Sequence, residues 1–187
     1  AYPDVLAAIK QLGYNEKNIK VLIHQFVSII NDAKVVKMST RKGNFITLDK
    51  LIDEVGIDVV RYFFIMRGIN SHLNFDLDLA KQRSENNPIY YIQYAHARIC
   101  TILNKNNDIT FNDSDLSLIN SESEIQLIYL LVEFEDLILK LSSSLEPQIL
   151  ANYLFELAGK FHKYYAKTRI ISDNHELTKS RLQFIKA

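Results

Sequence analysis

The chain has 187 residues, 48% of them apolar, so it is long enough to bury one compact core or two small ones. Its 22 Lys and Arg balance 22 Asp and Glu, which excludes a strongly basic RNA-binding protein and leaves a local basic patch for any RNA contact. The single cysteine, Cys100, cannot form an internal disulfide, and no Cys/His spacing indicates zinc. Because neither a membrane span nor a signal peptide is visible, we expect a cytoplasmic protein without bound metal or membrane contact.

The first part of the chain predicts a small α/β unit. Gly13 is placed to end a first amphipathic helix, and Thr47 is placed to cap a later one. In chain order we expect a helix over 5–12, a strand over 19–30, a short return strand at 35–36, helices over 48–55 and 58–66, and an extended connection over 71–78.

From about residue 79 the apolar residues recur with the period of a helix, and no further strand is expected. The pattern predicts helices over 79–85, 89–105, 122–143, 147–169 and 175–187. The fold class is therefore mainly α. A small α/β part at 1–78 precedes an α-helical bundle at 79–187, with the break near 76–81.

A cationic loop follows the predicted return strand. Within seven residues it carries three cations, two hydroxyls and a glycine: Lys37, Met38, Ser39, Thr40, Arg41, Lys42 and Gly43. Such a loop can close over a polyphosphate, because cations neutralise its charge while hydroxyls and amides donate hydrogen bonds. Spacing alone also allows an ordinary solvated turn, and short motifs often arise by chance.

The helix predicted over 89–105 carries two stripes. One holds apolar residues around His96, which we expect to be a buried, hydrogen-bonded histidine. The other holds Tyr91, Tyr94, Arg98 and Lys105. Unstacked RNA bases stack on aromatic rings and on the planes of Arg side chains. Tyrosine is equally common where helices pack together, so periodicity leaves both interpretations open.

The loop resembles the KMSKS signature of class I aminoacyl-tRNA synthetases, and its surroundings resemble the arginyl-tRNA synthetases in particular. Beyond the loop, the matching residues are Asn44, Phe45, Thr47 to Asp49, Leu51 to Gly56, Arg61 to Phe64, Phe75 to Ala80, Glu85 to Pro88, and the run Tyr90, Tyr91, Gln93, Tyr94, Ala95, His96, Ala97 and Arg98. The resemblance is dense over about 34–100. It implies a small remnant of a Rossmann-type catalytic domain followed by a helical anticodon-binding domain.

The resemblance implies an enzyme that joins arginine to tRNA(Arg) through an arginyl-adenylate, with ATP and Mg²⁺ as substrate and no bound metal or prosthetic group. Lys37 would stabilise charge on the departing pyrophosphate, while Ser39 would help to shape the closed loop. Thr40 stands where the family pattern has its second lysine, so Arg41 or Lys42 could supply that cation. The implied tRNA-binding residues are Asn86, Asn87, Tyr91, Tyr94, Arg98, Tyr164 and Tyr165.

The other class I signature, a His-Ile-Gly-His-like sequence, is not found in these 187 residues. We therefore expect no aminoacylation by this chain alone. Two alternatives are a cysteinyl-type class I synthetase, which shares a related helical domain, and a non-catalytic helical RNA-binding or scaffold protein.

Overall fold

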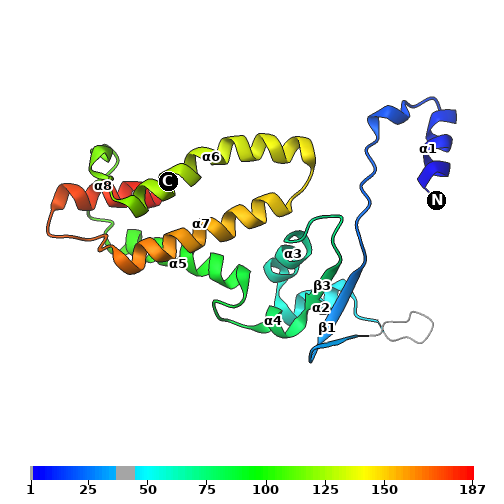
Figure 1. The fold of residues 1–187 in the computed structure, drawn as a ribbon, viewed down its shortest axis with the longest axis horizontal. Coiled ribbons are helices and arrows are strands. Elements are labelled where there is room, and N and C mark those ends of the chain that lie inside the picture. Colours follow the sequence, from blue (N-terminus) through cyan, green and yellow to red (C-terminus); the bar gives the residue numbers. More distant parts are fainter. Residues whose placement is uncertain (1, 37–44) are drawn as a thin grey trace.

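The computed structural model describes residues 2–36 and 45–187. Figure 1 shows a small sheet with short helices to the right of the centre of the view and a bundle of long helices to its left. The N-terminal segment, with helix α1 (Tyr2–Gln11) and the short 3-10 helix η1 (Glu16–Asn18), extends away from both. The mainly α fold with a small α/β part is as predicted.

The sheet has three strands in the order β2-β1-β3. Strand β1 (Val27–Asn31) pairs antiparallel with β2 (Lys34–Val35) and parallel with β3 (Leu73–Asp76). Asp32 and Ala33 turn the hairpin with φ of 50° and 56°, which suits the right-handed twist of the strands they join. The hairpin therefore places the start of β2 beside the carboxyl end of β1, and Val36, which follows β2, beside Ile29 in the middle of β1.

Three helices cover the sheet: α2 (Leu48–Val55), α3 (Ile57–Ile65) and α4 (Leu77–Lys81). Thr47 caps α2 as predicted, because its side chain accepts a hydrogen bond from the Lys50 amide at 3.2 Å. The core between sheet and helices is apolar and includes the fully buried Phe63 and Phe75, whose ring centroids lie 5.3 Å apart.

The bundle consists of α5 (Pro88–Lys105), α6 (Glu122–Ser144), α7 (Gln148–Lys167) and α8 (His175–Lys186), with a 3-10 turn η3 (Leu116–Leu118) before α6. Its core includes Ala95, Leu127, Phe161 and Leu182. The bundle also contacts the sheet part, since the Tyr62 hydroxyl donates to the Ala151 carbonyl at 3.4 Å and Ala151 belongs to the core beneath α3. The start of α7 is thereby tied to α3.

Three predicted elements differ from the structure. Only Val27–Asn31 of the strand predicted over 19–30 forms a strand, and Val21, Ile23 and Phe26 are exposed. In the described part of the chain the pairing of β1 with β3 begins at Val27. The residues before Val27 have β-forming side chains but are not part of a strand.

The expected connection at 71–78 contains a strand, β3, because residues 73–76 lie along β1. The helix expected over 79–85 begins two residues earlier, at Leu77, where the Asp76 carboxylate caps it by accepting from the Leu79 amide at 2.9 Å. Helix α4 then packs against β1 and α2.

Gly159, in the middle of α7, faces Tyr91. A Cβ at this position would lie 3.7 Å from the Tyr91 hydroxyl, an ordinary van der Waals distance. Alanine is the better helix former by up to about 1 kcal/mol, so Gly159→Ala is expected to raise the free energy of unfolding by up to that amount. Urea denaturation measures it. A loss of stability would mean that Tyr91 cannot share this space with a methyl group.

Candidate nucleic-acid interface

Helix α5 starts at a buried cap residue, Asn87, whose side chain is held by hydrogen bonds. Asn87 is 2% exposed and caps the helix by accepting from the Ile89 amide at 3.2 Å. Its amide nitrogen donates to the carbonyls of Ala80 at 3.1 Å and Gln82 at 2.9 Å. These bonds orient α5 relative to α4. Asn86, directly before it, is exposed.

One face of α5 carries a row of side chains spaced four residues apart. The rings of Tyr90 and Tyr94 are nearly parallel, at an interplanar angle of 6° and a centroid distance of 6.4 Å. The Arg98 guanidinium carbon lies 4.5 Å from the centroid of Tyr94, and its Nη2 donates to the Tyr94 hydroxyl at 2.7 Å. Tyr94 is 46% exposed, so the row borders solvent.

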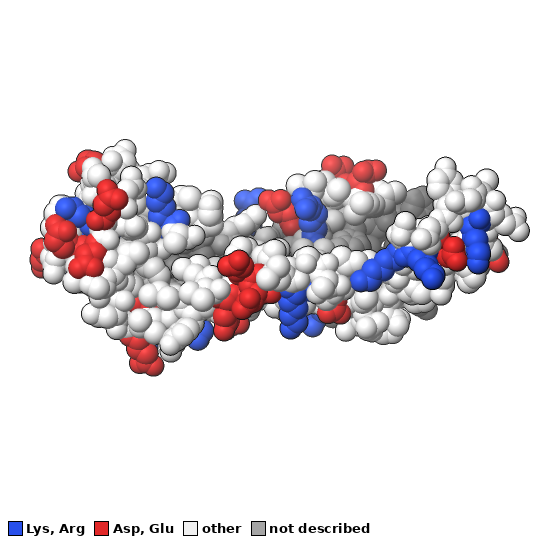
Figure 2. Space-filling view, turned by 90° about the horizontal axis from the view of Figure 1, so that it is seen from above, with Lys and Arg blue, Asp and Glu red and all other residues white. Residues whose placement is uncertain are grey.

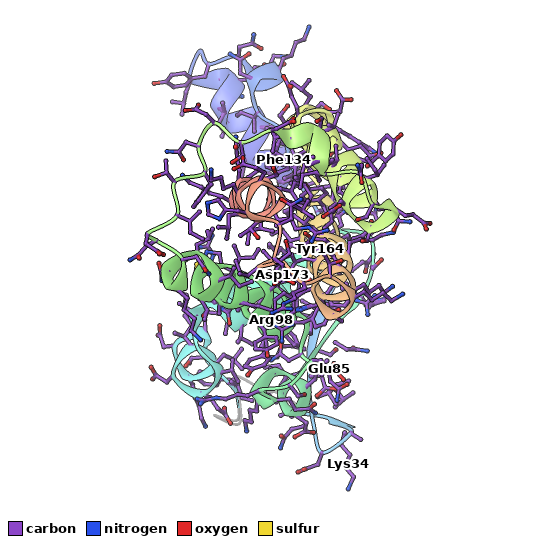
Figure 3. All side chains as sticks on the ribbon, turned by 90° about the vertical axis from the view of Figure 1, so that its left-hand side faces the viewer. Lys34, Glu85, Arg98, Phe134, Tyr164 and Asp173 are labelled. Carbon is purple, nitrogen blue, oxygen red and sulfur yellow. The ribbon has the colours of Figure 1, made fainter. Side chains whose placement is uncertain are left out.

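Helix α7 completes this site from the other side. The Arg98 guanidinium carbon also lies 4.4 Å from the ring centroid of Tyr165, which is 37% exposed. The guanidinium is therefore held by two tyrosine rings through cation–π contacts. Figure 3 shows Arg98 between the two helices. We call Tyr90, Tyr94, Arg98 and Tyr165 the tyrosine–arginine platform.

A pocket of about 480 Å³ opens beside the platform, lined by Glu85, Tyr90, Tyr91, Tyr94, Arg98 and His162. Four of these six residues present flat aromatic rings, and only one is acidic. Figure 2 shows Lys, Arg, Asp and Glu scattered over the face that it views, between wide uncharged areas. An RNA contact on that face would therefore depend on local groups rather than on a broad positive field.

Three residues predicted to contact RNA are not part of the platform itself. Tyr91 turns toward α7, where its ring centroid is 5.4 Å from that of Phe155 and 4.4 Å from that of His162. Tyr164 is fully buried and its hydroxyl donates to Glu124 at 3.2 Å, while Asn87 is the buried cap of α5. Tyr164 and Asn87 are thus buried and hydrogen-bonded within the protein, so in this structure neither side chain is accessible to RNA.

Tyr164 belongs to a polar network inside the bundle. The Glu124 carboxylate also accepts from the Ser121 amide at 3.0 Å, the Ser121 hydroxyl at 2.7 Å and Arg181 Nε at 2.8 Å. Burial raises the pKa of Glu124, but the hydrogen bonds from Ser121 and Arg181 outweigh it and leave the pKa below its ordinary value. Burial and the Glu124 charge raise the pKa of the Tyr164 hydroxyl far above its ordinary value.

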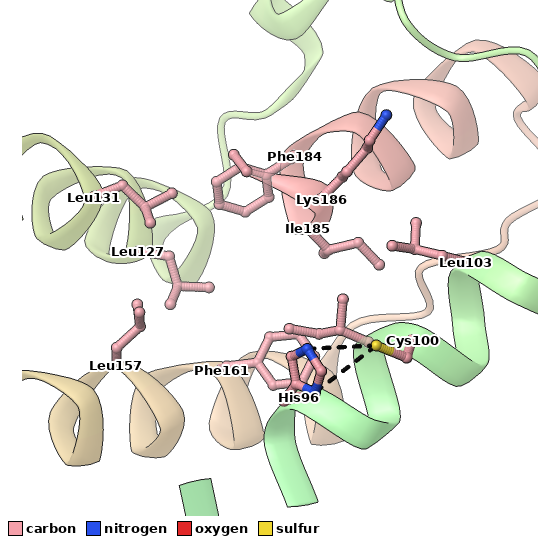
Figure 4. A pocket seen from close by; sticks show the side chains of 12 residues that line it. His96, Cys100, Leu103, Leu127, Leu131, Leu157, Phe161, Phe184, Ile185 and Lys186 are labelled. Carbon is pink, nitrogen blue, oxygen red and sulfur yellow. Dashed lines mark hydrogen bonds between the residues drawn. The ribbon is translucent and has the colours of Figure 1, made fainter. Parts of the chain in front are cut away.

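His96 is exposed, which corrects the expectation of a buried histidine. It lies at the rim of an apolar pocket of about 350 Å³ between α5, α6, α7 and the end of α8 (Figure 4), and its Nε2 is 3.6 Å from the Cys100 sulfur. The core side of α5 passes instead through Ala95, which is buried. The helical period thus predicted the core-facing side of α5 correctly but wrongly included His96 in it.

The cationic loop, Lys37, Met38, Ser39, Thr40, Arg41 and Lys42, lies outside the described residues. Its flanks are described. The Val36 amide donates to the Ile29 carbonyl at 2.8 Å, and after the loop Thr47 starts α2. Across residues 2–36 and 45–187, no three His, Cys, Asp or Glu side chains gather as metal ligands would. No described helix is long and apolar enough to cross a membrane.

Three residues of the platform and its pocket, Tyr90, Glu85 and His162, were not among the predicted tRNA-binding residues. The spacing Tyr90, Tyr94, Arg98 is a run of i, i+4 neighbours and could have indicated Tyr90 in place of Tyr91. His162 gave no such signal, because its neighbours come from α5, more than sixty residues earlier in the chain.

Comparison with known proteins defines the class first. Residues 1–90 match the family model described as tRNA synthetases class I (M), and residues 92–187 match the DALR anticodon binding domain. A sheet remnant followed by this helical bundle is thus the arrangement of a class I aminoacyl-tRNA synthetase. Since the second model covers just over half of the chain, the bundle is a DALR anticodon-binding domain.

Curated relatives that match the chain are arginine–tRNA ligases. An arginine–tRNA ligase of Salinibacter ruber is 45% identical over 98% of this chain and 33% of its own length. One from Chlorobaculum tepidum is 46% identical over 97% of this chain and 34% of its own length. The chain belongs to the arginyl-tRNA synthetase family and spans about a third of the length of these relatives. Neither the cysteinyl nor the scaffold alternative is favoured.

Solved structures agree with this assignment. One from Campylobacter jejuni, described as an arginyl-tRNA synthetase, superposes with a TM-score of 0.82 at 28% identity, covering 98% of this chain and 41% of that one. Thermus thermophilus arginyl-tRNA synthetase shares the fold at 24% identity and a TM-score of 0.62, over 78% of this chain and 25% of that one.

Proposed function

We propose that the protein is an arginine–tRNA ligase in which this chain contributes the ATP-phosphate loop and part of the anticodon contact. Its substrates are arginine, ATP as the magnesium salt, and tRNA(Arg), and its compartment is the cytoplasm. The observation that supports the RNA contact most directly is the Arg98 guanidinium held between Tyr94 and Tyr165 at a partly exposed surface. The family to which the chain belongs supports the reaction.

The platform suits a single-stranded loop of RNA. Bases splayed from such a loop stack on aromatic rings and guanidinium planes with little sequence preference, at about 1–3 kcal/mol for each base. Tyr94 and Tyr165 offer partly exposed rings, and the exposed Asn86 offers an amide that both donates and accepts hydrogen bonds. We place the anticodon contact at the platform and Asn86.

The loop over 37–42 is proposed to hold the phosphates of ATP. When the arginine carboxylate attacks the α-phosphate, pyrophosphate leaves with increased negative charge, and an ammonium group beside it lowers the barrier. Lys37 is proposed for that role. Ser39 helps to shape the closed loop. Because Thr40 replaces the second lysine of the family pattern, either Arg41 or Lys42 supplies the second positive charge. The flanking β2 and α2 provide firm attachment points.

Replacing Arg98 tests the RNA contact. Arg98→Ala is expected to weaken tRNA(Arg) binding by about 1–3 kcal/mol, because it removes the central group of the platform. Fluorescence anisotropy with labelled tRNA, at a fixed salt concentration, measures the affinity.

Arg98→Lys is the matched variant, since it keeps the charge but not the planar group. It should recover only part of the affinity, because an ammonium is a poorer partner for two rings. Lys140→Ala, an exposed charge loss on α6, serves as the control and should change binding little. If Arg98→Ala binds tRNA as well as the unmodified protein, the anticodon contact lies elsewhere.

A further inference from the structure

His162 lies on α7 directly beside the platform and is half-buried. Its ring centroid is 4.4 Å from that of Tyr91 and 5.7 Å from that of Tyr94. Its Nε2 is 3.1 Å from the Tyr91 carbonyl oxygen, and its Nδ1 is 3.5 Å from Arg98 Nη1. The imidazole thus joins the α5 backbone to the guanidinium of the platform.

The partners determine which nitrogen carries the proton. A carbonyl oxygen can only accept, so Nε2 must donate to Tyr91 and therefore bears the hydrogen. In the neutral ring Nδ1 is then left with a lone pair. Arg98 can only donate, so its Nη1 is matched to that lone pair. The neutral ring with its hydrogen on Nε2 satisfies both contacts, whereas the ring with its hydrogen on Nδ1 satisfies neither.

We infer that His162 is a positioning residue for tRNA binding, acting through Arg98. A free Arg side chain loses about 2 kcal/mol of rotamer entropy when it is immobilised. The contact from Nδ1, together with the Tyr94 and Tyr165 rings, restricts the guanidinium before RNA arrives and so reduces that loss on binding. This role rests on the anticodon contact proposed for Arg98.

Charged and titratable groups around His162 come from two neighbouring segments. Helix α5 presents Tyr91, Tyr94 and Arg98, and the loop before it contributes Glu85 to the same pocket. His162 itself packs against the rings of Tyr91 and Tyr94 and is bonded to the backbone, so the geometry assigns it to holding Arg98 rather than to touching RNA.

A double-mutant cycle in the full chain tests the inference. His162→Phe keeps an aromatic ring but removes both nitrogen contacts, and it is expected to weaken tRNA(Arg) binding about three- to tenfold. In the Arg98→Ala background the same change should have no further effect, because the side chain through which it acts is gone. His175→Phe, at an exposed histidine of α8, is the matched control and should leave the affinity unchanged.

The possible outcomes separate this inference from the proposed function. If Arg98→Ala does not alter affinity, the anticodon contact fails and the inference falls with it. If Arg98→Ala weakens binding but His162→Phe does not, only the positioning role is overturned. Equal losses from His162→Phe with and without Arg98 would assign His162 to general packing and would also overturn the role.

A second measurement is made on the unmodified protein without tRNA, so it does not depend on whether a substituted protein folds. Long-range ¹H–¹⁵N correlation spectra of the unmodified protein report the tautomer of each histidine. For His162 we expect a protonated Nε2 and an unprotonated Nδ1. A protonated Nδ1 in the neutral ring would remove the acceptor for Arg98 and would contradict the inference.

Discussion

Glu124→Gln is expected to lower the free energy of unfolding by about 3–5 kcal/mol, because it leaves a partly buried Arg181 without its counter-ion. Glu124 is 1% exposed and receives four donors from three places in the bundle: the Ser121 amide and hydroxyl, the Tyr164 hydroxyl and Arg181 Nε. A glutamine must direct its NH₂ group at one pair of these donors, so it cannot replace the carboxylate.

The network also predicts how this contribution depends on pH. Because the pKa of Glu124 is lowered in the folded protein, its stabilisation is complete above the ordinary glutamate value of 4.5 and is lost as pH falls through the lower, folded-state value. The stability difference between the unmodified protein and Glu124→Gln should therefore shrink in acid. A difference that grows as pH falls below 4.5 would contradict this assignment.

Urea denaturation followed by circular dichroism measures the effect of Glu124→Gln, at neutral pH and again at acid pH. Glu122→Gln is the matched control, since it makes the same chemical change in the same first turn of α6 at an exposed side chain. It should change stability by no more than about 0.5 kcal/mol. If the two variants lose equal stability, the buried network is not what holds α6, α7 and α8 together.

The second large effect is expected at the proposed phosphate loop. Lys37→Ala, made in the complete enzyme, should slow arginyl-adenylate formation by about 10²–10³-fold, comparable to the loss of one group that stabilises transition-state charge. The affinity for tRNA should stay nearly intact, because the platform lies on α5 and α7. ATP–pyrophosphate exchange measures the first quantity and anisotropy the second.

Lys34→Ala provides the comparison for Lys37→Ala. Lys34 is an exposed cation of β2, only three residues before Lys37, and its loss should leave exchange close to normal. Equal losses of exchange and tRNA affinity in Lys37→Ala would indicate misfolding rather than a missing charge. Equal losses of exchange in the two variants would indicate that general positive charge, not Lys37 itself, serves the ATP phosphates.

The family could be recognised from sequence because its signals are local and dense. The run from Tyr90 to Arg98 and the loop with its flanks lie within about 65 residues, and the comparisons confirm the arginyl assignment. The roles of individual loop and platform residues stay predictions. For the platform, the structure adds that Tyr94, Arg98 and Tyr165 do lie together.

The strands show where local signals were insufficient. Residues 19–26 have the composition of a strand but join no ladder among the described residues, and only Gln25 and Phe26 share a backbone hydrogen bond with another segment. The less apolar 73–76 becomes β3 because β1 lies beside it. Strand formation requires hydrogen bonds to another segment, and a single segment does not reveal its neighbour.

The sequence by itself determined most of the helices, the Thr47 cap, the family and the presence of the cationic loop, because helical hydrogen bonds and caps join residues only a few positions apart. Only the tertiary structure decided which tyrosines face solvent. Tyr90 and Tyr165 join the platform, while Tyr91 packs on α7 and Tyr164 is buried against Glu124. Exposure on a helix depends on what packs against it, and the contact that brings His162 to Arg98 joins residues 64 positions apart.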